Sequence, residues 1–374
     1  MKAKLVRLVS LVALAAGVFA LLLAHLFSSL APLSSSMGAR AKPALLLGLA
    51  AAIPGVALSL LTAGQPGGPA TAAKSAGTQM RPPAPVRPVQ AARRAVRFAG
   101  PLVLGAMLGW FAFGVFIYAV QDQLVFSPRR LTPERLERVR SEYPQAQDVE
   151  IVSGDGTVLR GWLLPPWSPR ADATGKWPLV IVFAGQGGEA SGYFELSRWL
   201  PDMAWAFVNY RGYGASDGTP SDKGIFQDAV AVYDYFAARP DIDADKIFAL
   251  GGSMGTGVAT YLAAHRPVAA VVLFSPYDSI GAGVARDIVP WLPTGLLFRN
   301  RFDAAAYAPR ASAPAMAVVG DADLVIRPAR SLELLRRWGG PTELLIVPGG
   351  DHYSIYETDA AWHAVQAFVR GAVK

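Results

Sequence analysis

Short apolar runs and amphipathic segments alternate along the last two thirds of the chain. Residues 149–166 predict two strands joined by a Gly-Asp-Gly turn. Six further apolar runs are too short for ordinary helices; they span 178–185, 204–210, 246–252, 268–275, 313–321 and 342–350. Helical periodicity lies between them, at about 189–200, 223–238, 254–265, 328–338 and 358–371. This alternation predicts an α/β domain with a largely parallel sheet and ligand chemistry at the carboxyl ends of its strands.

The pattern Gly-x-Ser-x-Gly occurs twice, around Ser253 and around Ser216. A nucleophilic serine of this type needs a buried strand directly before it and a helix directly after it, with glycines because the turn leaves no room for side chains. Ser253 has "KIFAL" before it and "TGVATYLAAH" after it. Ser216 lies several residues beyond its strand and is followed by Asp and Pro. We therefore predict Ser253 as the nucleophile and Ser216 as a loop serine; a Gly-rich turn without chemistry is the alternative for Ser253.

A serine nucleophile needs a base, and an acidic group that holds the base in the right tautomer. His352 follows the last apolar run in a loop, where it can face Ser253, and we predict it as the base. Asp323 follows the preceding run and is the predicted acid, with Asp321 as the near competitor; Asp351 is expected to shape the turn that holds His352. The other histidines lie in apolar or helical segments: His25, His265 and His363.

An oxyanion hole requires backbone N–H groups that point at the attacked carbonyl oxygen. We predict the N–H of Met254 as one donor and the N–H of Gln186 as the other, in the stretch "AGQGGEAS" after the first parallel strand. The neighbours Gly185 and Gly187 would let this loop approach the substrate closely. Taken alone, the loop also fits an ordinary strand-to-helix turn.

The first third of the chain differs sharply in charge. Residues 1–120 contain eleven Lys or Arg and no Asp or Glu, whereas the remainder has 24 basic and 28 acidic residues. The net charge of +7 thus arises entirely from a segment with three long apolar runs, which is typical of a membrane topology signal and not of nucleic-acid binding. We predict a membrane region over 1–120 and a hydrolytic domain over 121–374.

Candidate membrane helices span 8–30, 44–63 and 99–120, each long enough to cross a bilayer. The first could instead be a cleaved signal peptide, and the second, which contains Pro54, a re-entrant or buried segment. The basic Pro/Gly/Ala-rich tract 64–98 is predicted to be a flexible loop. With three spans, the positive-inside rule places the C-terminal domain outside the cytoplasm, on the plasma (inner) membrane.

Several motifs occur in an order that resembles the serine α/β-hydrolases of the Bem46 type, which include the ABHD13 and ABHD17 relatives. These motifs are "QDQLVFSPRR", "NYRGYGASDGTPS", "GGSMGTG", "FSPYDSI", "PWLP…FRNRFDA", "GDADLVI" and "GGDHYS". The resemblance covers about 118–372 and implies the α/β-hydrolase fold with a Ser253, Asp323, His352 triad that cleaves esters, thioesters or amides through an acyl-enzyme. It departs at Ala184, where the family usually has His, and at Asn209, where Asp is commoner; we expect a changed oxyanion loop and an intact triad.

Residues 276–312 form a predicted short cap with several apolar side chains, which either line an acyl pocket or make the cap's own core. We therefore expect a membrane-anchored serine hydrolase (esterase, lipase or thioesterase) that acts on a small-molecule or lipid acyl group beside the membrane. A peptidase, an acyltransferase and a catalytically inactive membrane-interaction protein are the alternatives. No cofactor, metal or nucleic-acid partner is expected, and no residue pattern selects an oligomeric state. The chain has no cysteine, which excludes thiolate chemistry.

Overall fold

The computed structural model describes the backbone of residues 88–168 and 175–372, and the side chains in those ranges from residue 105 onward. The predicted spans 8–30 and 44–63 lie outside the described residues. The described chain divides into two compact units, one that ends at Val120 and one that begins at Gln121.

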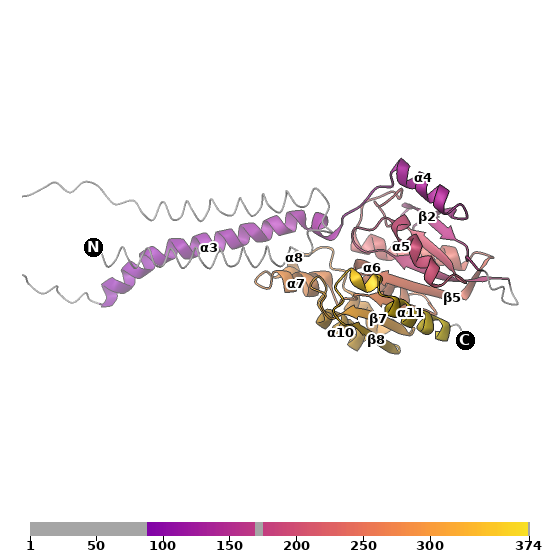
Figure 1. The fold of residues 1–374 in the computed structure, drawn as a ribbon. Coiled ribbons are helices and arrows are strands. Elements are labelled where there is room, and N and C mark those ends of the chain that lie inside the picture. Colours follow the sequence, from indigo (N-terminus) through magenta and orange to yellow (C-terminus); the bar gives the residue numbers. More distant parts are fainter. Residues whose placement is uncertain (1–87, 169–174, 373–374) are drawn as a thin grey trace, which may run out of the picture. The chain divides into compact units, whose positions relative to one another are not determined.

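Helix α3 (Pro88–Val125) begins earlier than expected (Figure 1). The prediction of a flexible loop over 64–98 is wrong for 88–98, which form its first turns. Proline is favoured at the first position of a helix, and the Ala, Arg and Gln that follow are good helix formers. Within α3, residues Gly105–Val125 are long and apolar enough to span a membrane, whereas the prediction gave 99–120. Among the described residues this is the one such helix, and one is weak evidence of a membrane protein.

The second unit contains an eight-stranded sheet with the order β1-β2-β4-β3-β5-β6-β7-β8. The first two strands pair antiparallel, β2 pairs antiparallel with β4, and all other neighbours are parallel. The strands are β1 (Gln147–Val152), β2 (Val158–Leu164), β3 (Trp177–Phe183), β4 (Ala204–Val208), β5 (Ile242–Gly252), β6 (Ala270–Phe274), β7 (Ala315–Gly320) and β8 (Thr342–Val347). The prediction of a mostly parallel α/β sheet is confirmed.

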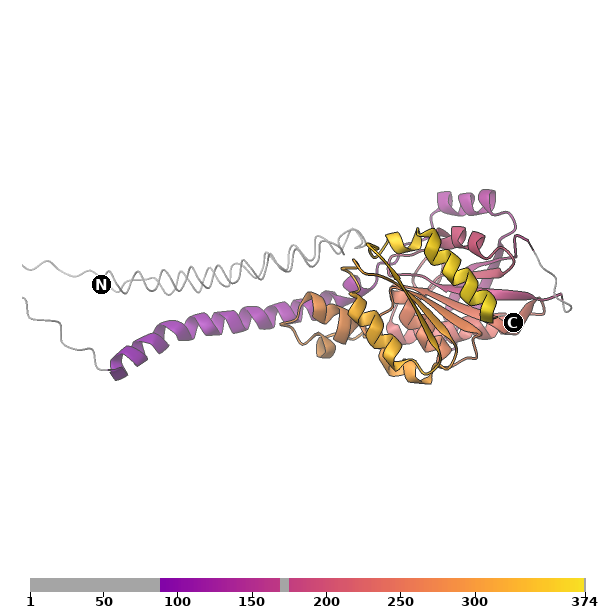
Figure 2. The same ribbon diagram turned by 60° about the horizontal axis from the view of Figure 1, so that its bottom comes forward.

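Helices cover both faces of this sheet, as parallel strands require. Figure 2 shows α11 and α10 on opposite faces. The longer helices are α4 (Pro133–Glu142), η2 (Ala190–Trp199), α5 (Asp222–Ala237), α6 (Met254–Ala263), α10 (Pro328–Arg337) and α11 (Asp359–Ala372); the short ones are η3 (Ile280–Val284), α7 (Ala285–Ile288), α8 (Thr294–Leu297), α9 (Ala304–Tyr307), η4 (Ala308–Arg310) and η5 (Ser354–Tyr356). Apart from α4, for which no helix was predicted, the longer helices match the predicted segments within a few residues.

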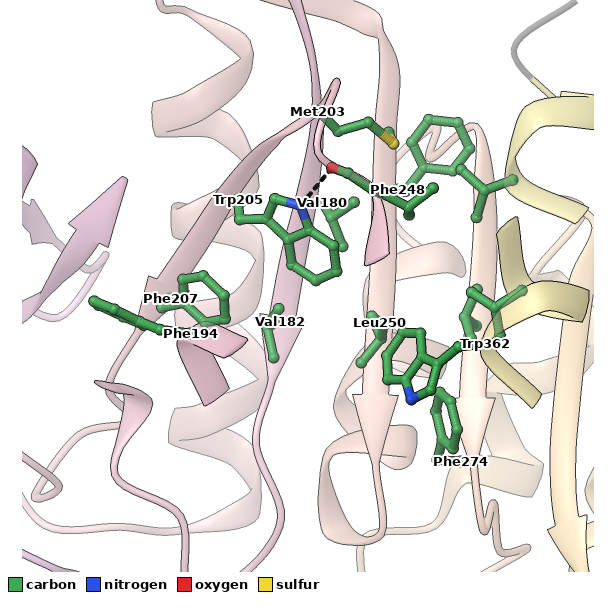
Figure 3. Close-up of a cluster of buried hydrophobic side chains, with 14 of the residues drawn as sticks. Val180, Val182, Phe194, Met203, Trp205, Phe207, Phe248, Leu250, Phe274 and Trp362 are labelled. Carbon is green, nitrogen blue, oxygen red and sulfur yellow. Dashed lines mark hydrogen bonds between the residues drawn. The ribbon is translucent and has the colours of Figure 1, made fainter. Parts of the chain in front are cut away.

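Large aromatic side chains fill the core between the sheet and the layer formed by η2 and α11 (Figure 3). Trp205 and Phe207, two residues apart on β4, point to the same face, and Trp362 of α11 packs over β6. The indole N–H of Trp205 donates to the carbonyl of Leu200 at 3.2 Å, so burial leaves its polar group paired. The opposite face packs on α5 and α6. The sheet is thus held rigidly from both sides, and its carboxyl ends form a fixed platform for the loops that follow.

Candidate active site

Ser253 occupies the turn between β5 and α6 in a backbone conformation that side chains rarely adopt, with φ of 51° and ψ of −119°. Gly251 and Gly255 make this turn possible. An added Cβ on Gly251 would lie 2.5 Å from the carbonyl oxygen of Gly255, and one on Gly255 would lie 2.0 Å from that of Phe183. The N–H of Ser253 donates to the carbonyl of Phe274 on β6 at 2.9 Å. The sharp turn therefore holds the hydroxyl at the sheet's carboxyl edge.

His352, in the loop after β8, lies beside this hydroxyl, with its Nε2 3.0 Å from Ser253 Oγ. Its Nδ1 lies 2.8 Å from Asp323 Oδ2. An ionised carboxylate only accepts hydrogen bonds, so Nδ1 carries the hydrogen and Nε2 accepts from Ser253 Oγ. The three residues predicted from the sequence as nucleophile, base and acid thus form one hydrogen-bonded chain.

Asp323, in the loop after β7, is almost fully buried and accepts four hydrogen bonds. Its Oδ1 accepts from the N–H groups of Val325 and Ile326, each at 2.8 Å, and its Oδ2 accepts from His352 and from the hydroxyl of Ser275 at 2.7 Å. These four donors leave the carboxylate little freedom to rotate, so it fixes the plane of the imidazole.

The competing acid Asp321 makes a different contact. Its Oδ1 accepts from the N–H of Gly349 at 2.7 Å, which ties β7 to the turn after β8. Asp351 accepts from the N–H groups of Tyr353 and Ser354 and so shapes the turn around His352, as expected. Neither carboxylate is hydrogen-bonded to the imidazole.

Ser275 is a residue of the site that sequence reasoning missed. It follows β6 directly, is buried, and has φ of 48°, a conformation that turns its hydroxyl toward Asp323. The sequence contained one signal for Ser275, namely its position directly after the apolar run that forms β6. In the sheet, β6 lies between β5 and β7, and each of those two strands is followed by a candidate functional residue.

The loop after β3 lies beside the serine. An added Cβ on Gly185 would be 3.6 Å from Ser253 Cβ. The N–H of Gly185 donates to the Tyr193 hydroxyl at 3.3 Å, and the Tyr210 hydroxyl donates to the carbonyl of Ala184 at 2.9 Å. Burial raises the pKa of both tyrosines, which keeps their hydroxyls protonated. The predicted donor Gln186 lies in this loop, and Met254 begins α6, where the first N–H groups have no partner within the helix.

Asn209, the second departure from the resembled family, supports this loop. Its side-chain carbonyl accepts from the N–H of Ala190 at 2.9 Å, and its amide donates to the carbonyl of Arg160 at 3.2 Å. An aspartate could make the first bond but would place a charged oxygen against the second carbonyl. The amide therefore suits this position.

The predicted cap over 276–312 contains η3, α7, α8, α9 and η4. Two of its apolar side chains, Leu292 and Phe298, are buried within it, whereas Leu296 is 81% exposed. The buried pair does not line an open acyl pocket, whereas the exposed Leu296 can contact a ligand or a surface. Among the described residues, no group of three or more His, Asp or Glu side chains could hold a metal ion.

Ser216 is fully buried and structural. Its Oγ donates to the carbonyl of Asn209 at 2.9 Å and accepts from the N–H of Arg160 at 2.8 Å. We expect Ser216→Ala to lower the free energy of unfolding by about 1–3 kcal/mol, because it leaves two buried backbone groups unpaired. Urea unfolding followed by tryptophan fluorescence measures this loss. The exposed Ser141→Ala is the control and should shift stability by less than about 0.5 kcal/mol; equal stability of both variants would contradict the assignment.

Comparison with known proteins places the chain in a family. Residues 176–302 match the family described as Hydrolase_4, serine aminopeptidase S33. The uncharacterized protein Rv2307c of Mycobacterium tuberculosis is 32% identical over 251 residues, which cover 66% of this chain and 86% of that protein. The chain belongs to the α/β-hydrolase family.

Further similarities of this α/β-hydrolase are more distant. The α/β-hydrolase domain-containing protein WAV2 of Arabidopsis thaliana is 30% identical over 189 residues, 47% of this chain and 55% of that protein. The solved esterase PF2001 of Pyrococcus furiosus superposes with a TM-score of 0.53 at 20% identity, covering 67% of this chain and 98% of that one. Likeness at that identity establishes the fold alone.

Proposed function

We propose that this α/β-hydrolase is a membrane-anchored serine hydrolase of the Bem46 type that cleaves acyl esters or thioesters. The observation that carries the proposal is the strained Ser253, whose Oγ lies 3.0 Å from Nε2 of His352. A hydroxyl in such a turn is exposed to substrate and has its base within hydrogen-bonding distance.

In the proposed mechanism, Ser253 Oγ attacks the acyl carbonyl carbon while His352 Nε2 accepts its proton. The carboxylate of Asp323 stabilises the resulting imidazolium. The N–H groups of Met254 and Gln186 would stabilise the tetrahedral oxyanion. The bond to the leaving group then breaks, and His352 returns the proton to the departing alkoxide or thiolate. Water repeats the sequence on the acyl-enzyme and releases the carboxylic acid and the free serine.

The membrane part of the proposal rests on α3 and on charge. Several large apolar side chains of α3 are more than half exposed: Met107, Leu108, Phe111 and Val115. They belong to an apolar stretch of 21 residues, which suits a bilayer core better than water. The basic N-terminus and the basic tract 64–98 would then stay on the cytoplasmic side of the inner membrane, with the hydrolase domain on the other side. The substrate would be an acyl group carried by a lipid or by a small molecule near the bilayer.

Labelling of the detergent-solubilised protein with a fluorophosphonate probe tests the serine. We expect wild type and Ser216→Ala to be labelled and Ser253→Ala to remain unlabelled, because phosphonylation requires the activated hydroxyl. Ser216→Ala is the matched control, since it lies in the same sequence pattern. A folded wild type that takes no label would refute the proposal.

Peptide hydrolysis is the second candidate, favoured by the match of residues 176–302 to the serine aminopeptidase family. Turnover rates measured on acyl p-nitrophenyl esters of increasing chain length, on an acyl thioester and on an aminoacyl naphthylamide distinguish ester or thioester hydrolysis from peptide hydrolysis. Faster turnover of the naphthylamide would favour the peptidase.

A further inference from the structure

The last turn of α3 is hydrogen-bonded to the loop that contains the proposed oxyanion donor. The side-chain amide of Gln186 donates to the carbonyl of Leu124 at 2.7 Å. The main-chain carbonyl of Gln186 accepts from the Tyr213 hydroxyl at 2.8 Å and, at the longer distance of 3.4 Å, from the N–H of Ser127. Gln186 is thus held through its side chain by the last turn of α3, and through its carbonyl by Tyr213 and, more weakly, by Ser127.

The same segment is fixed on its other side by the cap. The buried Gln121 donates to the carbonyl of Leu297 at 3.2 Å and accepts from the N–H of Arg299. Asp122 accepts from the side chains of Arg299 and Asn300, each at 2.8 Å. Four residues, Gln121, Asp122, Leu124 and Ser127, therefore form a bracket between the cap and the loop after β3, and this bracket holds the Leu124 carbonyl in place as an acceptor.

Gln186 is flanked by glycines in the sequence. Gly185 precedes Gln186, and Gly187 and Gly188 follow it. The Gly185 carbonyl, in the same peptide as the Gln186 N–H, accepts from the N–H of Gly188 at 3.1 Å. Glycine has the greatest backbone freedom of all residues, so this short turn gains support from the bonds that Gln186 makes to other segments. An oxyanion donor is effective only when it points at the position of the developing charge, within about 2.7–3.1 Å.

We propose that the Gln186 side chain is a positioning residue for the oxyanion hole, and that the end of α3 is the support it acts against. This inference rests on the proposed function. The side chain acts on the reaction through its own backbone: its bond to Leu124 restrains the Gln186 Cα and with it the direction of the Gln186 N–H, the proposed oxyanion donor. The carbonyl of Leu124, at the end of the candidate membrane helix, thus contributes to the geometry of the proposed oxyanion hole.

Gln186→Leu in the full-length protein, in detergent, tests this inference. We expect kcat on a p-nitrophenyl ester to fall about 10- to 100-fold, because a slightly misplaced donor loses most of its effect, while KM changes less than about threefold because ground-state contacts remain. The preference for an ester over the matching thionoester should also shrink, since sulfur accepts hydrogen bonds weakly. A role in folding alone would leave that ratio unchanged.

Gln123→Leu is the matched control, because Gln123 is an exposed glutamine of the same turn, and it should keep wild-type kcat. Gln186→Met, which keeps the length of the side chain without a donor, guards against a folding defect in the leucine variant. If folded Gln186 variants keep wild-type kcat and an unchanged ester-to-thionoester ratio, this inference is wrong and the proposed function is unaffected. A wild type that the fluorophosphonate probe does not label would overturn the proposed function and this inference with it.

Discussion

Asp323→Asn is expected to lower kcat about 10⁴-fold, the order found when a triad loses the correct histidine tautomer. The expectation follows from the contacts of the carboxylate. Its Oδ1 accepts from two backbone N–H groups, so an asparagine there would place its carbonyl oxygen at Oδ1 and its NH2 at Oδ2. That NH2 would donate to His352 Nδ1 and force the ring hydrogen onto Nε2. Nε2 could then no longer accept the proton of Ser253.

Asp321→Asn is the matched control. An asparagine oxygen can still accept from the N–H of Gly349, so we expect near-wild-type kcat. Steady-state kinetics on one p-nitrophenyl ester, with thermal unfolding of each variant, measures the difference. If kcat falls as much in Asp321→Asn as in Asp323→Asn, then a change in the loop, and not the lost hydrogen bond to His352, causes the fall.

The sequence was sufficient to predict where the chain forms its parallel strands. In such a sheet, residues just past the carboxyl ends of strands gather at one edge, whatever their separation in the chain. Ser253, Asp323 and His352 each follow a strand in this way, after β5, β7 and β8. Their proximity therefore follows from the parallel topology of the sheet, and the alternation of apolar runs in the sequence predicts that topology.

Contacts that depend on side-chain direction were not predictable in this way. The bonds from Gln186 to Leu124 and from Tyr213 to Gln186 join segments 62 and 27 residues apart, and no periodicity records them. The helical start of α3 was missed for a different reason. A Pro/Gly/Ala-rich composition favours a loop on average, but the glycines end well before Pro88 and the remainder is rich in alanine and arginine.

Gly255→Ala is expected to lower the free energy of unfolding by at least about 3 kcal/mol, the upper range for added atoms in a packed interior. An alanine Cβ would lie 2.0 Å from the carbonyl oxygen of Phe183 and 2.7 Å from that of Ala184, both backbone atoms of β3 and its loop. Backbone cannot rotate away as a flexible side chain can, so α6 must shift from β3. Gly371→Ala is the control, since nothing lies within 4 Å of its added Cβ, and it should change stability by less than about 0.5 kcal/mol.

The same shift would separate the two proposed oxyanion donors, because Met254 begins α6 and Gln186 lies in the loop after β3. The close approach at Gly255 is what brings those two elements together around Ser253. Urea unfolding followed by tryptophan fluorescence, combined with kcat measured on the fraction that remains folded, should show both losses in Gly255→Ala. Lost stability with full kcat would separate the two effects and place the oxyanion donors elsewhere.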